Sequence, residues 1–445
     1  MQSVRVRWSI LLMLALSILL AACGGAPASQ PTTAPAATTA ATAEATAEAT
    51  AEATAEATAE ATAEATVEAT AEATAEANAE PYIFGMVLVG TTNDGGWNQA
   101  HYDAAKYVEE RIPGSKFIFI DKLNSADRPN VTTEQAIDEL LAQGAQFVIT
   151  NSAEFGDGTS NAARANPDVY FVHASGDGVL AGTAPSNVSN VMGRMEYGKM
   201  IAGCAAALQS ETGNLSYLGP LIDAETRRLV NATYLGAKYC WTEVRGKPIE
   251  ELSFKVTWIG FWFNIPGVTL DPTQVANDFI NGGSDVIISG IDTTEALVEA
   301  NKATAAGKKV YAIPYDYEAA CDQAPEVCLG VPYFNWGPIY LELISAAKAG
   351  TFEQRWDWIA PDWSDMNNPD TSIVGFVKGN ALTAENATTL DNFIAMLADG
   401  SLNLYTGPLN YQDGTPFVAE GAVADDKTVW YTEQLLEGIE GQSAP

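Results

Sequence analysis

Short apolar runs alternate with amphipathic segments along most of the chain after residue 80. The runs are rich in Val, Ile, Phe and Tyr, and most are flanked by Gly, Pro, Asp or Asn, which predicts buried strands. They occupy residues 82–90, 116–121, 146–150, 169–174, 215–219, 254–260, 285–290 and 308–314. Segments with helical patterning lie between them, at residues 98–111, 132–144, 224–239, 272–283 and 293–309. This alternation predicts an α/β fold with parallel sheets that carry helices on both faces.

A longer helical segment at residues 193–210 separates the first group of strand and helix units from the second. Residues 81–445 are numerous enough for two lobes of ordinary domain size, each with its own core. The simplest assembly is two doubly wound lobes that face each other. We expect the first lobe at about residues 81–212, with a return segment after about residue 335, and the second lobe at about residues 213–334.

The beginning of the chain has the layout of a secretion signal. Arg5 and Arg7 precede a short apolar stretch that ends in small residues and is too short to span a membrane comfortably. Its end, "LAAC", resembles the lipobox of bacterial lipoproteins, in which the cysteine becomes the N-terminus and carries a lipid. We therefore expect a signal peptide at residues 1–22, lipidation of Cys23 and an extracytoplasmic protein anchored to the cell membrane. An ordinary cleaved signal or a single uncleaved anchor is the alternative.

Residues 26–80 contain almost only Ala, Thr, Glu and Pro, with a strict four-residue repeat. A helix would line one face with glutamates and offer no lysine to relieve the repulsion, and the segment has no apolar core to bury. We expect residues 23–80 to form a mostly disordered tether. A partner-binding repeat is the alternative, but the segment offers no aromatic anchor for a partner.

Charge and cysteine content narrow the possible partners. The chain has 56 acidic and 23 basic residues, a net charge of −33 and no basic run, which argues against nucleic acid as a partner. Four cysteines follow Cys23, and an even count in an exported chain predicts two disulfides. The short loop "CDQAPEVC" suits a bond between Cys321 and Cys328, which leaves Cys204 to pair with Cys240. The chain has no CxxC motif and only two histidines, so a metal site is not expected.

Aromatic and acidic residues follow several of the predicted strands directly. Ligands of parallel α/β folds bind beyond the carboxyl ends of the strands. Aromatic rings stack on flat ligands, and carboxylates accept hydrogen bonds from a ring edge, so this pattern predicts a cleft for a heterocycle or a sugar. A single tryptophan on a loop more often serves core or hinge packing. The prediction therefore depends on the set, which comprises Trp97, Phe155, Trp262, Phe263, Asp292 and Asp316.

Enzyme classes find little support in the sequence. No dense carboxylate motif lies near the first strand, as a nucleoside or sugar hydrolase would need. No G-x-S-x-G elbow is present, and "GTTNDGG" lacks the G-x-G-x-x-G spacing of dinucleotide binding. We expect a binding protein without catalytic residues or a cofactor. An exported hydrolase and a ligand-sensing surface lipoprotein of the same fold remain the alternatives.

Several segments resemble the basic membrane protein family of lipoproteins, the substrate-binding proteins of ABC-type importers for purines and nucleosides. The resemblance covers most of the chain from residue 82 to about residue 376. It is carried by "DGGWNQAHYDAA", by residues 148–176 and 187–207, by "FWFNIPG" and by "NWGPIYLELISAAKAGTF".

The resemblance implies a type I periplasmic-binding-protein fold whose cleft captures a purine base or nucleoside for an ABC permease. It implies aromatic walls from Trp97, Phe155 and Trp336, with Trp262 on a neighbouring loop. It implies hydrogen bonds to the ligand from Asn98, Asn151, Asp292 and Asp316. His101 either faces the cleft or is a satisfied helix residue. Arg194, Glu196 and Glu225 are assigned to the hinge and the lobe interface.

Overall fold

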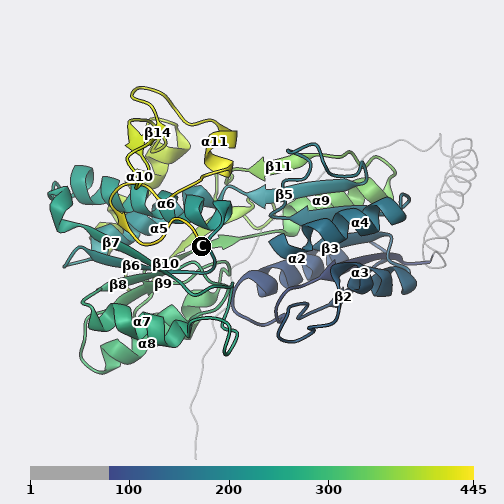
Figure 1. Cartoon of the computed structure of the whole chain (residues 1–445), viewed down its shortest axis with the longest axis horizontal. Coiled ribbons are helices and arrows are strands. Elements are labelled where there is room, and N and C mark those ends of the chain that lie inside the picture. The colour runs from purple at the N-terminus through teal and green to yellow at the C-terminus, as the bar shows by residue number, and fades with distance from the viewer. Residues whose placement is uncertain (1–79) are drawn as a thin grey trace, which may run out of the picture. The chain divides into compact units, whose positions relative to one another are not determined.

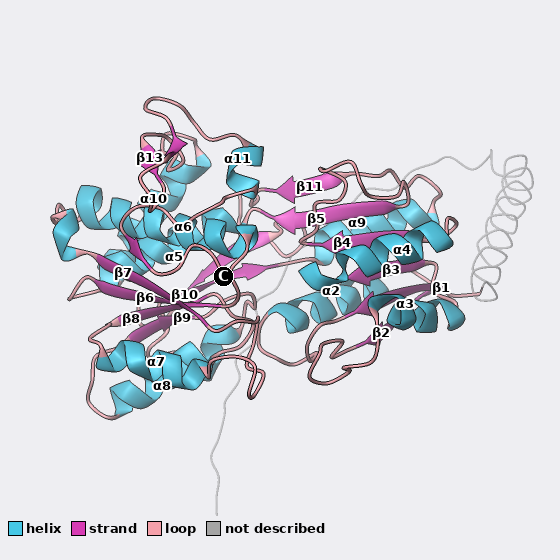
Figure 2. Cartoon of the chain, in the orientation of Figure 1, coloured by secondary structure: helices cyan, strands magenta, loops and turns pink. Residues whose placement is uncertain are grey.

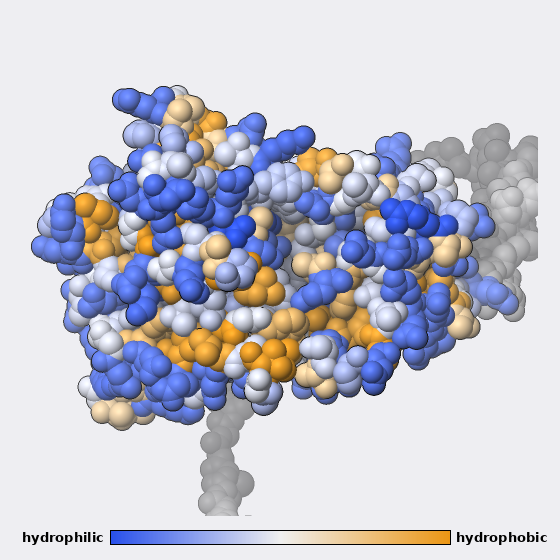
Figure 3. All heavy atoms as spheres, in the orientation of Figure 1, coloured by the Kyte–Doolittle hydropathy of each residue, from blue (hydrophilic) through white to orange (hydrophobic). Residues whose placement is uncertain are grey.

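The computed structural model describes residues 80–445, which form two lobes side by side (Figure 1). The expected signal peptide, the lipidated Cys23 and nearly all of the tether lie outside the described residues. Within residues 80–445, no helix is both long enough and apolar enough to cross a membrane. The face drawn in Figure 3 is mostly hydrophilic, with apolar residues gathered mainly along its lower part.

The first lobe contains a six-stranded parallel sheet with the order β11-β5-β4-β3-β1-β2. Its strands are β1 (Tyr82–Val87), β2 (Ser115–Ile120), β3 (Phe147–Thr150), β4 (Tyr170–Ala174), β5 (Val188–Gly193) and β11 (Trp356–Ile359). The strand β3 is buried along its whole length, as expected of a central strand covered on both faces. Helices pack in pairs against this sheet, α2 (Trp97–Arg111) with α9 (Gly337–Lys348) and α3 (Thr133–Ala142) with α4 (Gly156–Ala165) (Figure 2).

The second lobe contains a five-stranded parallel sheet with the order β15-β7-β6-β8-β9. Its strands are β6 (Asn214–Gly219), β7 (Ser253–Trp258), β8 (Val286–Ser289), β9 (Tyr311–Ile313) and β15 (Ile439–Glu440). Its helices are α5 (Met195–Gln209), α6 (Ala224–Tyr239), α7 (Pro272–Asn281) and α8 (Glu295–Ala305). Short helical turns are η2 (Cys240–Val244), η3 (Ile249–Glu251) and η4 (Ala320–Gln323) in this lobe and η1 (Ala153–Phe155), between β3 and α4, in the first lobe.

The helices α5 and α6 pack backbone to backbone. A Cβ atom at Gly203 would stand 1.9 Å from the carbonyl oxygen of Thr233, and one at Gly236 would stand 1.9 Å from that of Met200. Neither glycine can therefore carry a side chain without separating the helices. The structure also joins Cys204 of α5 to Cys240 beside the end of α6, and it joins Cys321 to Cys328.

Because of this helix contact, the boundary between the lobes differs from the one that the sequence pattern predicts. The sequence pattern assigns residues up to 212 to the first lobe, but α5 packs on α6 and belongs to the second lobe. The chain therefore crosses between the lobes directly after β5, near Arg194. The physical reason is that the apolar surface of α5 is matched by α6 and not by the first sheet.

Residues after 335 return only partly to the first lobe. The helix α9 and the strand β11 do so, whereas β12 (Val374–Lys378) pairs antiparallel with the preceding strand β10 (Gly330–Phe334), and both of these strands contact α5. The helix α10 (Ala384–Ala398) also packs on α5. The final elements are the hairpin of β13 (Leu409–Asn410) and β14 (Pro416–Val418), then α11 (Asp426–Trp430) and β15.

Candidate ligand cleft between the lobes

The carboxyl ends of the two sheets face each other and enclose a pocket. In this arrangement the room left for a water-sized molecule is about 20 Å³, within about 460 Å³ of space between the lining atoms that includes open solvent. Both lobes contribute to the lining, and among the contributing residues are Trp97, Asn151 and Ser175 of the first lobe and Trp262, Asp292 and Asp316 of the second. The pocket therefore lies where the fold predicts a ligand.

The two lobes touch where the first loop enters α2. Gly96 lies against the backbone of Asp292, and a Cβ atom at Gly96 would stand 1.9 Å from the Asp292 carbonyl oxygen. Gly95 has a φ of 72°, in the region that favours glycine. The glycine pair before Trp97 thus turns the chain and allows close contact between the lobes.

Trp97 has a fixed orientation at the start of α2. Its Nε1–H donates to the carbonyl oxygen of Asn151 at 2.6 Å. Its ring meets Trp336 and Phe334 edge to face, with both centroid distances 5.4 Å. The side chain is 8% exposed, so part of the ring lines the pocket while the rest belongs to the core. The indole is therefore in place before a ligand arrives.

Asn98 and Asn151 hold the first and third loops together. The Asn98 Oδ1 atom accepts from the Gly90 N–H and from Asn151 Nδ2, both at 2.9 Å. The Asn151 Oδ1 atom accepts from the Val89 N–H at 3.0 Å. Asn151 lines the pocket, whereas Asn98 lies outside the lining. These bonds fix the shape of the two loops, and Asn151 keeps one amide N–H that no protein atom accepts.

A stack of buried rings stands behind Trp97. Trp336 lies between Phe334, at a centroid distance of 4.8 Å, and His101, at 4.4 Å. The Nδ1 atom of His101 is 2.8 Å from the hydroxyl of Tyr340, and burial lowers the pKa of His101 well below its ordinary value. His101 and Trp336 lie outside the pocket lining. His101 is buried and its Nε2 atom has no hydrogen-bond partner, so it does not match the satisfied helix residue of the sequence alternatives.

Phe155 also lies outside the lining. Its side chain is 3% exposed and belongs to the core at the start of α4. The family resemblance assigns Phe155 and Trp336 to the aromatic walls, but in this structure both support the loops from behind. Their rings turn inward because the neighbouring strands and helices offer them a dry environment.

The polar atoms that remain unpartnered in the pocket belong to three side chains. The Nε1 atom of Trp262, Oδ2 of Asp292 and both carboxylate oxygens of Asp316 are buried and have no hydrogen-bond partner. Buried polar groups are normally satisfied, and a set that converges on one pocket indicates a ligand. These atoms offer one donor and three acceptor positions.

Asp316 is held in a strained backbone conformation. Its φ is 73°, which is uncommon for a residue other than glycine. The strain is fixed from outside, because the Asp316 N–H donates to Pro332 O and the Phe334 N–H donates to Asp316 O, both at 3.1 Å. Residues kept in such conformations cluster at functional sites.

The two aspartates share an acidic environment. Burial raises the pKa of Asp292 well above its ordinary value, and the nearby Asp316 raises it further. Burial raises the pKa of Asp316 in the same way, while the Lys199 ammonium opposes the shift. Burial in the pocket therefore favours the protonated form of both carboxyl groups.

Two ionisable residues near the pocket were not predicted to act on a ligand. Lys199 of α5 is fully buried, donates to the Ser289 carbonyl oxygen at 2.7 Å and lies 3.2 Å from the ring centroid of Tyr315. Burial lowers its pKa to about 7, against the influence of Asp316. Glu225 lines the pocket, and burial raises its pKa to about 8, against the influence of Arg228. A lone lysine in an Ala-rich helix was the available signal for the first of these.

Two lobes of parallel α/β structure that enclose an aromatic and acidic pocket define a type I periplasmic-binding fold, as the family resemblance implies. No group of three potential metal ligands occurs among residues 80–445. The chain belongs to the Bmp family, described as "ABC transporter substrate-binding protein PnrA-like", whose model matches residues 83–360. The family resemblance drawn from the sequence motifs is confirmed, and the protein has a substrate-binding role.

Individual relatives agree with this assignment. A purine-binding protein of Brucella abortus (strain 2308) is 27% identical over 362 residues, which cover 80% of this chain and 92% of that protein. The putative ABC transporter glucose-binding protein TsgA13 of Haloferax volcanii is 26% identical over 275 residues, 61% of this chain and 62% of that protein. A solved ABC transporter solute-binding protein from Conexibacter woesei DSM 14684 has the same fold, with a TM-score of 0.53 at 20% identity, over 72% of this chain and 98% of that one.

Proposed function

We propose that the cleft captures a purine base or nucleoside outside the cytoplasm and presents it to an ABC permease. The observation that carries the proposal is the set of unpartnered buried atoms on Trp262, Asp292 and Asp316, beside the indole of Trp97. A purine ring has donors and acceptors along its edge and two flat apolar faces. It therefore complements carboxylates, an indole N–H and an aromatic face together.

The proposed ligand rests against the indole of Trp97. Trp336 stands edge to face with Trp97 and outside the lining, so the second ring face meets a different lining residue, while Trp262 supplies its indole N–H to the ligand edge. Asp292 and Asp316 accept hydrogen bonds from N–H groups of the base. The named function of the Brucella abortus relative supports this choice of ligand.

A screen of ligands by thermal shift tests the proposal. The protein from about residue 81 onward is mixed with bases, nucleosides, sugars and amino acids. A ligand at 100 times its Kd stabilises the fold by about 2.7 kcal/mol, enough for a clear increase in Tm. An increase in Tm that occurs only with purine bases or nucleosides supports the proposal. Increases confined to sugars would favour the second candidate, a sugar-binding protein, which the name of the Haloferax volcanii relative suggests.

The lipid anchor is part of the proposal. Because Cys23 follows a small-residue signal end, it should carry the lipid that keeps the protein beside its permease. Metabolic labelling with a fatty acid should mark the wild-type protein and leave Cys23→Ser unmarked. Equal labelling of both proteins would show that the anchor is elsewhere.

A further inference from the structure

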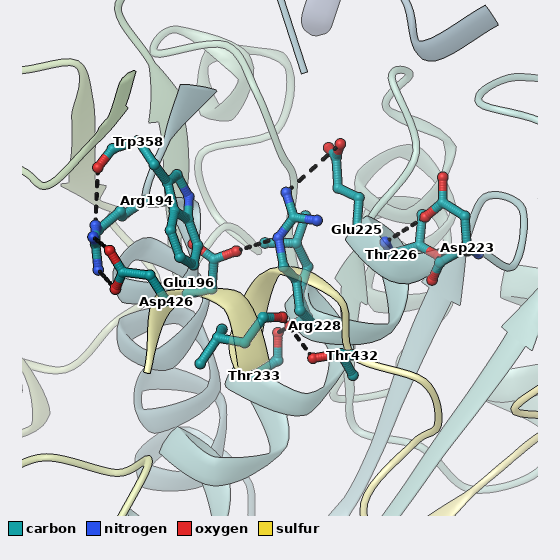
Figure 4. A network of polar contacts seen from close by, with 12 residues as sticks. Arg194, Glu196, Asp223, Glu225, Thr226, Arg228, Thr233, Trp358, Asp426 and Thr432 are labelled. Atoms are coloured by element: carbon teal, nitrogen blue, oxygen red, sulfur yellow. Dashed lines mark hydrogen bonds and ion pairs between the residues drawn. The ribbon is translucent and has the colours of Figure 1, made fainter. Parts of the chain in front are cut away.

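The C-terminal helix α11 lies where the two lobes meet, in the network of Figure 4. It follows the residues matched by the family model, which end at residue 360. Its side chains nevertheless contact residues of both lobes, including one beside the ligand pocket. These contacts give this short helix a position from which it can influence the cleft.

Contacts to the first lobe come from Trp430 and Asp426. The ring of Trp430 meets Trp356 and Trp358 of β11 edge to face, at centroid distances of 5.1 and 5.2 Å. Asp426 forms a two-pronged ion pair with Arg194, whose Nε–H donates to the Trp358 carbonyl oxygen at 2.9 Å (Figure 4). Arg194 stands where the chain crosses between the lobes, so α11 is attached to that crossing.

Contacts to the second lobe come from the same helix and the residues after it. The guanidinium of Arg228 on α6 lies 4.2 Å from the centroid of the Trp430 ring. Further on, the Leu436 N–H donates to Asn231 Oδ1 of α6 at 2.9 Å. Trp430 is therefore in contact with β11 on one side and with α6 on the other.

Arg228 connects α11 to the ligand pocket. It is 2% exposed, and its Nε–H donates to Glu196 Oε1 at 2.7 Å. Its Nη2 atom lies 3.8 Å from Glu225 Oε2 and has no hydrogen-bond partner (Figure 4). Since Glu225 lines the pocket, a small shift of its carboxylate completes the hydrogen bonding of Arg228. Removing one partner of a buried ion pair is strongly destabilising, so Arg228 depends on both glutamates.

We propose that α11 is a strap across the two lobes, which limits how far the cleft opens and holds Arg228 in position behind Glu225. The strap and a bound ligand then stabilise the same closed arrangement. The proposal depends on the binding role of the cleft and not on the identity of its ligand. Arg228 acts as a positioning residue, since it does not line the enclosed pocket itself.

Distances between the lobes test the strap directly in the full chain. Nitroxide labels on cysteines introduced at the exposed positions Asp138 and Ala306, in a Cys23→Ser background, report the separation by pulsed electron paramagnetic resonance. Without ligand, the wild-type strap should give one narrow distance distribution. Trp430→Ala should add a population at longer distance, because it removes contacts to both lobes.

Matched variants keep this test decisive. Asp426 is exposed, so Asp426→Asn should fold normally, lose the ion pair to Arg194 and shift the distribution in the same direction. Lys427→Ala, an exposed position of the same helix, is the control and should leave the distribution unchanged. Distributions for Trp430→Ala and Asp426→Asn that superimpose on the wild type would overturn the strap.

Calorimetry with adenosine tests the positioning of Arg228. If loss of the strap reduces tenfold the fraction of molecules whose cleft can close on a ligand, the apparent Kd rises about tenfold. Asp426→Asn should raise the Kd while its Tm without ligand stays unchanged, which a purely structural role would not produce. An unchanged Kd in both strap variants would contradict the link to Arg228. If adenosine does not bind the wild type, a purine that raises the Tm in the ligand screen replaces it; if no purine base or nucleoside binds, the purine proposal fails, while the distance measurement still decides the strap.

Discussion

Gly96 allows the two lobes to meet because it has no side chain. In Gly96→Ala, the new methyl group would collide with the Asp292 carbonyl oxygen, at 1.9 Å in the present arrangement. We expect the closed form to become unfavourable and ligand affinity to fall at least about tenfold, a loss of about 1.4 kcal/mol. The Tm without ligand should change little, since an open cleft has room for the methyl group.

Calorimetry and melting curves check the Gly96 prediction. Gly282→Ala provides the control, because a Cβ atom there would approach only carbonyl oxygens of its own helix. Wild-type affinity in a folded Gly96→Ala protein would mean that the binding form keeps the lobes further apart.

Trp97 contributes to both binding and folding. The sequence pattern predicts a loop residue whose loss leaves the fold intact, but the structure places much of the indole in the core. We therefore expect Trp97→Ala to weaken purine binding by about 1–3 kcal/mol, the range for stacking on an aromatic ring, and also to lower the Tm. Trp97→Phe keeps a ring and loses only the hydrogen bond to Asn151, so it should bind more tightly than Trp97→Ala. Calorimetry that finds equal affinity in all three proteins would exclude stacking.

Proton release should accompany ligand binding. Burial raises the pKa values of Asp292 and Asp316, and a ligand N–H group that donates to either carboxylate lowers its pKa again, so binding releases protons over the pH range in which these groups titrate. Because the free protein then binds more protons than the complex, affinity should rise with pH until these carboxyls are ionised. Titrations in buffers of different ionisation enthalpy should give different apparent enthalpies at pH 7. Asp316→Asn should reduce that difference, and buffer-independent enthalpies would refute the linkage.

Stability of the empty protein has the opposite pH dependence. A carboxyl with a raised pKa binds more protons in the folded state than in the unfolded state, so its contribution is lost as pH rises. For Glu225 this contribution to the free energy of unfolding is lost between about pH 4, near the ordinary pKa of a glutamate, and about pH 8, its pKa in the folded protein. Lys199 has a pKa lowered to about 7, so above that pH its contribution makes the folded protein more stable as the pH rises.

Residues that directly follow strands could be placed at the cleft from the sequence. Trp97, Trp262, Asp292 and Asp316 all line the pocket, because the carboxyl ends of parallel strands meet at one edge. Lys199 could not be found in this way, since it comes from the buried face of a helix that the pattern placed in the other lobe.

At the scale of elements, the strength of the local pattern decided what could be predicted. All eight apolar runs contain strands, and all five amphipathic segments contain helices. The strands β5, β10, β11 and β12 were not predicted; β10, β11 and β12 are stabilised by pairing with strands far away in the sequence, which a local pattern does not reveal. The short strands and the helix after residue 400 were not predicted for the same reason.

The disulfide beside α5 and α6 should be the more important of the two for stability. It joins cysteines 36 residues apart, whereas the other joins cysteines 7 residues apart. Longer loops lose more entropy on cross-linking, so replacing Cys204 and Cys240 by Ala should lower the free energy of unfolding by about 2–4 kcal/mol. Replacing Cys321 and Cys328 should have a smaller effect. Urea denaturation of the two double variants measures the difference, and a reversed order would contradict the loop argument.

At the scale of the whole molecule, the two-lobed fold followed from the sequence but the division between the lobes did not. The alternation of strands and helices is local information, while the side on which α5 packs depends on its contact with α6. Because α5 packs on α6, its residues Lys199 and Glu196 belong to the second lobe. Opening of the cleft therefore separates Trp97 from the carboxyl groups but leaves Lys199 beside Asp316.

The buried carboxyl groups have a consequence for the energetics of transport. Closing the empty cleft removes Asp292 and Asp316 from water without giving their unpartnered oxygens any replacement for it. A ligand that donates to these oxygens removes that cost, so within the limited opening that α11 allows, the fully closed shape becomes favourable mainly when a ligand is bound. For the proposed importer, a permease that recognises the closed shape would rarely engage an empty binding protein and would hydrolyse little ATP without delivering cargo.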